Sequence, residues 1–180
     1  MTDTDWSRLS DHERQNRDAW NADADDYQAR HGVQLEASSG LAWGTTQIPE
    51  AELNVLGDVV GKDILELGCG AAQWSIALAK LGARPVGIDL SDRQLEHARR
   101  LMAAAGVEFP LIHASAESVP LPDASFDIVT CRIAPHHFAD PRAYVAEVAR
   151  VLRPGGRFVM MDSTPVGEGD LDEFINKTEA

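Results

Sequence analysis

DILELGCGAAQWSIALAKLGARPVGIDLS, residues 63–91, is the stretch of sequence on which the fold depends. It begins with an apolar run typical of a buried strand and continues through Gly68, Cys69 and Gly70 into a run with helical spacing. A second apolar run follows and ends at Asp89. Because glycine leaves the main chain uncovered, such a turn between a strand and a helix lets a ligand approach the backbone closely. The stretch therefore predicts a strand–turn–helix–strand unit, with a ligand over the turn and a carboxylate beside it.

Short apolar runs and helical patterns go on alternating as far as residue 161, which is typical of an α/β fold with a parallel sheet. We expect strands at 63–67, 84–88, 109–113, 126–131 and 156–161, and helices at 73–81, 92–105 and 142–152. Ser91 and Gln94 have the spacing of a capping box, which predicts that the second helix begins directly after Asp89 and Leu90. Since the carboxyl ends of parallel strands lie along one edge of the sheet, we expect the ligand to bind at that edge.

The first part of the chain has a different pattern, with helices and loops in place of strands. A mainly polar helix is expected over 9–31, with Ser10 at its N-cap, and an amphipathic helix over 47–61. The residues between them, 32–46, are expected to form a loop. The chain is therefore divided into an N-terminal helical or lid segment at 1–62, a core at 63–162 and a tail helix at 163–180.

The composition narrows the classes of partner. With 180 residues, of which 44% are hydrophobic and 25% charged, the chain has the make-up of one globular domain. A formal charge of −13, from 29 acidic and 16 basic residues, repels phosphate backbones, so we expect a small molecule as partner and no nucleic acid. No apolar run approaches the about 18 residues of a membrane span, and the polar N-terminus does not read as a secretory signal. These features indicate a cytoplasmic protein.

The cysteines and histidines do not have the spacing of a metal site. Cys69 and Cys131 both lie in apolar, strand-like surroundings, where we expect buried free thiols. Four of the six histidines are scattered along the chain without ligand spacing: His12, His31, His97 and His113. No metal is therefore expected.

Two carboxylates near the glycine turn distinguish between two classes of ligand. Asp89 suits either a dinucleotide or S-adenosylmethionine, because a carboxylate accepts hydrogen bonds from both hydroxyls of a ribose. Glu66 lies among apolar neighbours two residues before Gly68, and a buried anion there would repel a pyrophosphate but attract the cationic amino-acid end of S-adenosylmethionine. Ala72 stands where a dinucleotide fingerprint usually has its third glycine. The residues therefore favour S-adenosylmethionine over NAD.

Three motifs together resemble the class I S-adenosylmethionine-dependent methyltransferases, nearest to a small-molecule branch similar to ubiquinone and menaquinone methyltransferases. They are DILELGCGAAQWSIALAKLGARPVGIDLS, HASAESVPLPDASFDIVTCRIAPHHFADP and EVARVLRPGGRFVMMD, within residues 63–162. The resemblance implies a Rossmann-like, doubly wound parallel sheet with strand order 3-2-1-4-5. It also implies methyl transfer from S-adenosylmethionine to a small organic acceptor.

The resemblance also implies roles for individual residues. Those expected to contact the methionine end, the ribose, the adenine and the methyl group are Glu66, Gly68, Cys69, Gly70, Asp89, Leu90, Ser115, Ala116, Glu117, Arg132 and Ile133. The family commonly has Asp at the position of Ser115, whose hydroxyl can still accept a hydrogen bond from the adenine amino group. Tyr27 and Trp43 are candidates for an aromatic lid over the cation.

Methyl transfer from a sulfonium is an in-line displacement, which depends mainly on the position of the acceptor and the exclusion of water. A base is needed only where the acceptor must lose a proton. His136 and His137 follow the fourth strand at the edge where the acceptor should arrive, and imidazole exchanges protons near neutral pH. We therefore expect one or both to face the acceptor, and either could act as a base.

The family fold usually continues after its fifth strand with a helix and an antiparallel strand pair, but only 18 residues follow Asp162 here. We expect that strand pair to be absent, so that the fifth strand is an open edge able to pair with a second copy of the chain. This leaves one alternative, a module that binds the cofactor without turnover because the sheet is incomplete. The second alternative is an NAD-dependent oxidoreductase.

Overall fold

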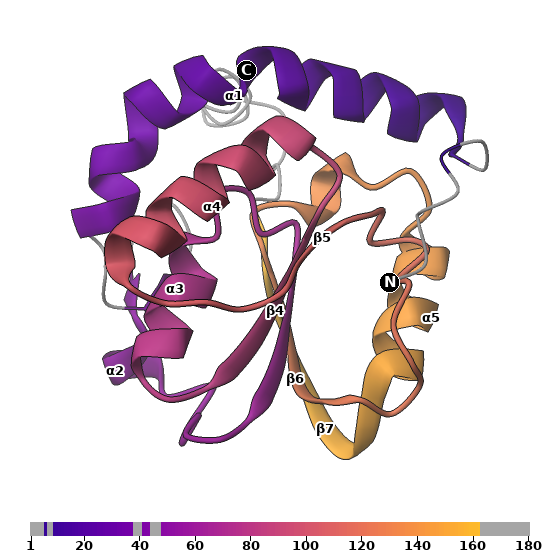
Figure 1. Ribbon diagram of the computed structural model, residues 1–180. Helices are drawn as coiled ribbons and strands as arrows, with labels where there is room; N and C mark the ends of the chain where they lie inside the picture. The colour runs from indigo at the N-terminus through magenta and orange to yellow at the C-terminus, as the bar shows by residue number, and fades with distance from the viewer. Residues whose placement is uncertain (1–5, 7–8, 38–40, 44–47, 163–180) are drawn as a thin grey trace, which may run out of the picture.

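The computed structural model describes residues 6, 9–37, 41–43 and 48–162. Its centre is a five-stranded parallel sheet of order β5-β4-β3-β6-β7 (Figure 1). The strands are β3 (Asp63–Leu67), β4 (Arg84–Asp89), β5 (Leu111–His113), β6 (Phe126–Arg132) and β7 (Leu152–Met161). This order is the predicted 3-2-1-4-5 arrangement, so the predicted fold class is confirmed. The order in which the strands are added along the sheet reverses between β3 and β6, although all five strands are parallel.

Helices cover both faces of the sheet (Figure 1). They are α3 (Gln73–Lys80) and α4 (Asp92–Ala105) on one face and α5 (Pro141–Val151) on the other. The alternation along β3 explains this, because Leu65 packs with Val148 of α5 while Ile64 packs with Leu78 of α3. Ser91 caps α4 as predicted, since Gln94 N donates to Ser91 Oγ at 3.1 Å. The second half of the predicted capping box is not formed, because Ser91 N donates to Asp89 Oδ1 at 2.8 Å and Gln94 Oε1 accepts from Gln28 Nε2 at 2.9 Å.

The first helix, α1 (Asp11–Ala37), arches across the carboxyl ends of the strands (Figure 1). Ser10 and Glu13 form a capping box at its start, through Glu13 N to Ser10 Oγ at 3.2 Å and Ser10 N to Glu13 Oε2 at 2.7 Å. Its contacts with α4 are polar: Asn21 Oδ1 accepts from Ser91 Oγ at 2.6 Å, and Asp25 pairs with Arg93 at 2.9 Å. The helix therefore docks by hydrogen bonds and ion pairs more than by an apolar stripe.

The predicted helix over 47–61 is wrong, because α2 extends only over Glu50–Leu53. Asn54 adopts a left-handed conformation with φ 49° and ends the helix, and Gly57 and Gly61 also have positive φ. The predicted loop at 32–46 also differs, since α1 continues to Ala37 and β1 (Ala42–Trp43) pairs antiparallel with β2 (Ile48–Pro49). Turn-forming residues thus outweigh the amphipathic pattern in this segment.

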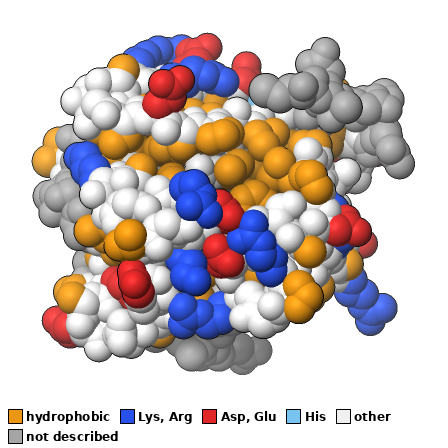
Figure 2. Space-filling view, turned by 60° about the horizontal axis from the view of Figure 1, so that its bottom comes forward, with side chains coloured by type: hydrophobic (Ala, Val, Ile, Leu, Met, Phe, Trp, Pro, Cys, Tyr) orange, Lys and Arg blue, Asp and Glu red, His pale blue; other side chains and the backbone are white. Residues whose placement is uncertain are grey.

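A cluster of charges ties together the starts of the strands, at the edge opposite α1. Asp63 accepts from Arg84 Nε at 2.7 Å and from Arg153 Nη2 at 2.8 Å, and Arg153 also pairs with Asp127 at 3.0 Å. Figure 2 brings this side of the molecule forward and shows basic and acidic side chains gathered in the middle of the face. The guanidinium of Arg84, together with Arg153, lowers the pKa of Asp63 to about 2. The stability that Asp63 contributes is therefore present above the pKa of the unfolded carboxyl and is lost as the pH falls toward 2.

The predicted strand bounds within the core agree with the structure to within two residues, except that β7 begins four residues before the expected Gly156. The expected tail helix at 163–180, and the expected absence of a further strand pair, concern residues outside the described part of the chain. Within the described residues, no helix is both long enough and apolar enough to cross a membrane.

Candidate functional site

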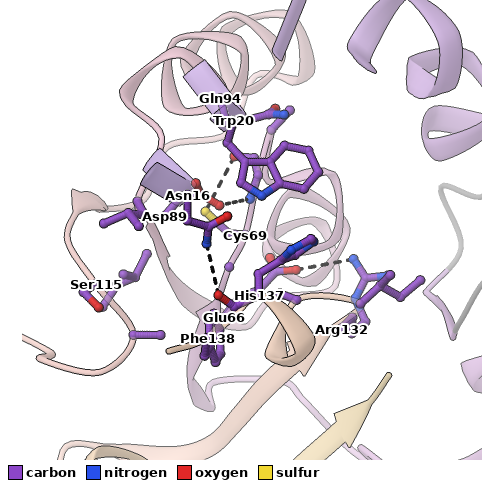
Figure 3. Close-up of a pocket in the computed structure, with 18 of the residues that line it drawn as sticks. Asn16, Trp20, Glu66, Cys69, Asp89, Gln94, Ser115, Arg132, His137 and Phe138 are labelled. Atoms are coloured by element: carbon purple, nitrogen blue, oxygen red, sulfur yellow. Dashed lines mark hydrogen bonds and ion pairs between the residues drawn. The ribbon is translucent and has the colours of Figure 1, made fainter. Parts of the chain in front are cut away.

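A cavity lies at the carboxyl ends of the strands, beneath α1 (Figure 3). Its floor is the turn after β3, at residues 68–71, and its walls are the end of β4, the loop after β5 at residues 114–117, and the end of β6 with the turn that follows. Residues of α1 form the roof. The cavity therefore lies at the point where the strand order reverses, which is the usual ligand position in open α/β sheets.

The two glycines of the turn have different reasons to be glycine. Gly68 has φ +66°, and a Cβ there would lie 2.6 Å from the Cβ of Ala134, in the loop after β6. Gly70 has φ +53°, and a Cβ there would meet only Gln94 Oε1, at 3.9 Å. Close packing of the protein therefore requires Gly68, while Gly70 leaves space open at the cavity floor.

Cys69 also lines the cavity, and burial raises the pKa of its thiol well above the usual range.

Glu66 lies at the base of the cavity and is 2% exposed. Its Oε2 accepts from Ser75 Oγ at 2.6 Å and from Ser75 N at 3.1 Å, and its Oε1 faces Arg132 Nη2 at 3.3 Å (Figure 3). Burial raises the pKa of Glu66, although Arg132 and Ser75 act in the opposite direction. Arg132 in turn lies over the ring of Trp74, 4.0 Å from its centroid. A buried carboxylate and a guanidinium are thus adjacent at one end of the cavity.

Asp89 joins the end of β4 to the glycine turn. Its Oδ2 accepts from Gly70 N at 2.7 Å and its Oδ1 from Ser91 N at 2.8 Å. Burial raises the pKa of Asp89. Leu90, which follows it, also lines the cavity. The carboxylate is therefore fixed by two backbone groups beside the glycine turn, and its role toward a ribose stays a prediction.

The loop after β5 brings Ser115, Ala116 and Glu117 to the cavity. Ser115 Oγ accepts from Glu117 N at 3.1 Å, so the hydroxyl helps to shape its own loop. The carboxylate of Glu117 accepts from the backbone N–H groups of Ala139 at 2.7 Å and Asp140 at 3.0 Å. Burial, together with the nearby Glu13, raises the pKa of Glu117. Glu117 thus ties the loop after β5 to the loop after β6.

The two histidines expected to face the acceptor are placed differently. Both lie on the 3₁₀ turn η2 (Pro135–His137), with ring centroids 3.9 Å apart. His137 lines the cavity and meets Trp20 of α1 edge to face at 5.2 Å (Figure 3). His136 is not among the lining residues, and its Nδ1 lies 2.6 Å from Asp162 Oδ1. Only His137 is therefore placed to meet a ligand.

Of the two aromatic residues expected to form a lid, only Tyr27 lines the cavity. Tyr27 lines the cavity from α1. Trp43 does not, because β1 carries it into the core against Trp74 at 4.7 Å, where its Nε1 donates to Glu50 Oε2 at 2.6 Å. The expected lid position of Trp43 therefore differs from its place in the structure.

Apart from Tyr27, the residues that α1 contributes to the roof were not predicted from the sequence. These include Glu13, Asn16, Trp20 and Gln28, and Gln28 is bonded both to Gln94 of α4 at 2.9 Å and to Gln73 of α3 at 3.0 Å. Glu13, Asn16, Trp20, Gln28 and Leu35 are separated by 3, 4, 8 and 7 residues, so they share one face of the helix. That spacing was the available signal, but it was carried mainly by polar side chains.

The sequence also matches a family of known proteins. The chain matches the family described as "Methyltransferase domain" over residues 65–160, which is more than half of its length. It belongs to this methyltransferase family. This confirms the family resemblance found in the three motifs.

The chain is similar to three proteins in particular. It is 41% identical over 114 residues to the uncharacterised methyltransferase YcgJ of Bacillus subtilis, covering 63% of this chain and 45% of that protein. The crystal structure of YcgJ matches with a TM-score of 0.63 and 36% identity, over 72% of this chain and 56% of that one. A demethylmenaquinone methyltransferase of Clavibacter sepedonicus is 41% identical over 117 residues, covering 64% of this chain and 47% of that protein.

The third is a crystal structure described as an S-adenosylmethionine-dependent methyltransferase from Mesorhizobium loti. It matches with a TM-score of 0.55 and 33% identity, over 61% of this chain and 50% of that one. The chain spans about half the length of the curated relatives it matches, 45% and 47% of the two named here.

Proposed function

We propose that this chain binds S-adenosylmethionine in the cavity under α1 and transfers its methyl group to a small organic acceptor. The observation that carries the proposal is the pair of the buried Glu66 with the partly buried Arg132 beside the glycine turn, with 3.3 Å between Oε1 and Nη2. The membership of the chain in the methyltransferase family supports it, as does the dependence on S-adenosylmethionine stated for the Mesorhizobium loti relative.

The Glu66–Arg132 pair matches the amino-acid end of S-adenosylmethionine. That end carries an ammonium and a carboxylate on the same carbon atom, so it needs an anion and a cation close to each other. Glu66 is available to the ammonium and Arg132 to the carboxylate, since Arg132 Nε is buried without a hydrogen-bond partner among the described residues. Charge-assisted hydrogen bonds of this kind are about twice as strong as neutral ones. We infer that the bound cofactor takes over part of the existing ion pair.

The rest of the cofactor follows the carboxyl ends of the strands. Asp89 accepts from the ribose hydroxyls, while Leu90 and Ala116 provide apolar contacts for the adenine. The open space above Gly70 allows the ligand to approach the main chain. Among the described lining residues, four carboxylates outnumber one guanidinium, that of Arg132. The carboxylates are those of Glu13, Glu66, Asp89 and Glu117. This excess of negative charge disfavours the pyrophosphate of a dinucleotide. An NAD-dependent oxidoreductase is therefore not favoured.

The acceptor enters on the side of His137, where Trp20, Tyr27 and Phe138 also line the cavity. These rings exclude water from the sulfonium and hold an acceptor close to the methyl carbon, which is the main requirement of an in-line displacement. His137 takes up a proton where the acceptor must lose one. We propose that α1 is the lid over this site, so that exchange of ligands requires it to move away from α4.

Binding of two adenosine compounds tests the proposal. We expect calorimetry to show that S-adenosylhomocysteine binds at least tenfold more tightly than 5′-methylthioadenosine, which lacks the amino-acid end. Arg132→Met should reduce this preference by about tenfold, because it removes the guanidinium that meets the carboxylate. Arg100→Met is the control, since Arg100 is 59% exposed and pairs only with Glu96 among the described residues. Equal affinity of the wild-type chain for both compounds would contradict the proposal.

Turnover separates a methyltransferase from a module that only binds the cofactor. We expect the chain to transfer labelled methyl groups from S-adenosylmethionine to at least one member of a panel of phenols, amines and thiols. Tight binding of S-adenosylhomocysteine without any transfer would favour the binding module.

A further inference from the structure

The backbone leaves β6 in a strained conformation before it reaches the cavity. Ile133 has φ +49°, a left-handed conformation that is an outlier for a residue branched at Cβ. Such strain persists only where surrounding contacts hold the backbone in place, and it is concentrated at functional sites. One of these contacts is Ile133 N to Met161 O, at 2.8 Å, between the end of β6 and the end of β7.

Asp162, directly after β7, makes a second set of contacts with the turn that follows β6. Its Oδ2 accepts from His136 N at 2.8 Å, and its Oδ1 lies 2.6 Å from His136 Nδ1. A carboxylate only accepts, so His136 Nδ1 carries the proton in this contact. The side chain of Asp162 is 15% exposed. One carboxylate therefore holds both the backbone and the ring of the residue before His137.

His137 is held from the opposite side by α1. Its backbone oxygen accepts from Asn16 Nδ2 at 3.2 Å (Figure 3). The same oxygen lies 3.2 Å from His12 Nε2. The backbone N–H of His137 donates to Ala134 O at 3.0 Å, and its ring contacts that of His136 in a tilted arrangement, with 3.9 Å between the centroids. The turn at 135–137 is thus fixed between β7 and the roof of the cavity.

We propose that Asp162 is a positioning residue: it holds the strained turn after β6 so that the His137 ring faces the acceptor. The inference rests on the proposed function, because it assigns His137 to the acceptor side of a methyl-transfer site. Asp162 itself does not line the cavity. It acts through His136, which explains why two histidines are adjacent although only one reaches the site.

Hydrogen–deuterium exchange of Asp162→Ala tests the geometry in the full chain, without any need for turnover. We expect exchange of the peptide covering residues 133–140 to increase at least tenfold, because the His136 N–H loses its acceptor, while β3 and β4 stay protected. Asp162→Asn retains one good acceptor and should give a smaller increase. The control is Asp123→Ala, a change at an exposed carboxylate that pairs with Arg150 at 2.7 Å.

If Asp162 positions His137, its loss should lower turnover and leave cofactor binding nearly unchanged. With the best acceptor of the phenol, amine and thiol panel, we expect Asp162→Ala to lower kcat about tenfold. The Kd for S-adenosylhomocysteine should change less than threefold. Unchanged exchange at 133–140 in Asp162→Ala would overturn the proposal. Faster exchange with an unchanged kcat would also overturn it, as would a loss of cofactor affinity as large as the loss of kcat. A wild-type chain that binds no S-adenosylhomocysteine would instead refute the proposed function, and exchange would still decide whether Asp162 fixes the turn.

Discussion

Gly68 and Gly106 have the same φ of +66°, yet only one of them is confined by its neighbours. A Cβ at Gly68 would lie 2.6 Å from Ala134 Cβ, whereas nothing lies within 4 Å of a Cβ at Gly106. The left-handed backbone costs an alanine about 1 kcal/mol at either position, and overpacking adds about 1–3 kcal/mol. At the residue scale, the glycine turn is therefore set by the close approach of the loop after β6.

This difference predicts the effect of two matched substitutions on stability. Gly68→Ala should lower the free energy of unfolding by about 3 kcal/mol, and Gly106→Ala by about 1 kcal/mol. Urea unfolding of both variants measures the two values. Equal losses would show that backbone conformation alone, and not contact with Ala134, requires glycine at position 68.

Glu66 and Asp89 predict a dependence of ligand binding on pH. Burial raises the pKa of both carboxyls in the free protein, so they gain protons at a higher pH than exposed carboxyls do. S-adenosylhomocysteine needs the ionised forms, and its affinity should therefore fall as the pH drops through these raised values. Calorimetry over a pH series measures this. Constant affinity down to the ordinary range of an exposed carboxyl would contradict it.

Glu66→Gln isolates the contribution of one carboxylate. The loss of a charge-assisted hydrogen bond should weaken S-adenosylhomocysteine binding by about 10- to 100-fold at neutral pH and flatten the pH dependence. Glu96→Gln, at an exposed position on α4, should change neither. An affinity for Glu66→Gln within twofold of the wild-type value would remove Glu66 from the site.

At the scale of elements, the sequence predicts the core better than the N-terminal segment. The bounds of β3 and the Ser91 cap of α4 follow from short-range patterns, because buried strands and caps have local signatures. The strand order was implied by the family resemblance. The roof residues on α1 do share one helix face, but their spacing is carried mainly by polar side chains, and the core position of Trp43 has no local signature. Their positions depend on contacts between distant parts of the chain, such as Asn21 with Ser91. The carboxylates beside the glycine turn, Glu66 and Asp89, were predicted from the sequence. The hydrogen bonds between His136 and Asp162 were not, because these residues are 26 positions apart in the chain.

The polar docking of α1 predicts that single hydrogen bonds control ligand exchange. Asn21→Ala removes the acceptor of Ser91 Oγ and of Arg93 N, and should weaken the contact between α1 and α4 by about 1 kcal/mol. We expect S-adenosylhomocysteine to dissociate several-fold faster in stopped-flow measurements. Asp23→Ala is the control on the same helix, because Asp23 bonds only to Arg30 among the described residues. Equal dissociation rates in the two variants would argue against a lid.

At the scale of the whole molecule, β7 pairs only with β6 among the described residues, and Met160 on it is 51% exposed. An edge strand of this kind can pair with another chain. We therefore predict that sedimentation velocity will show a monomer–dimer equilibrium, and that methyl transfer per chain will rise with protein concentration. A monomer with full activity at all concentrations would contradict this.

The most direct test of the account is the melting temperature of the full chain with each of two ligands. S-adenosylhomocysteine at about 100 times its Kd should stabilise the fold by about 2.7 kcal/mol, which corresponds to a rise of about 5–10 °C, whereas NAD at the same concentration should leave the melting temperature unchanged. A rise with NAD and none with S-adenosylhomocysteine would contradict the assignment of the cavity.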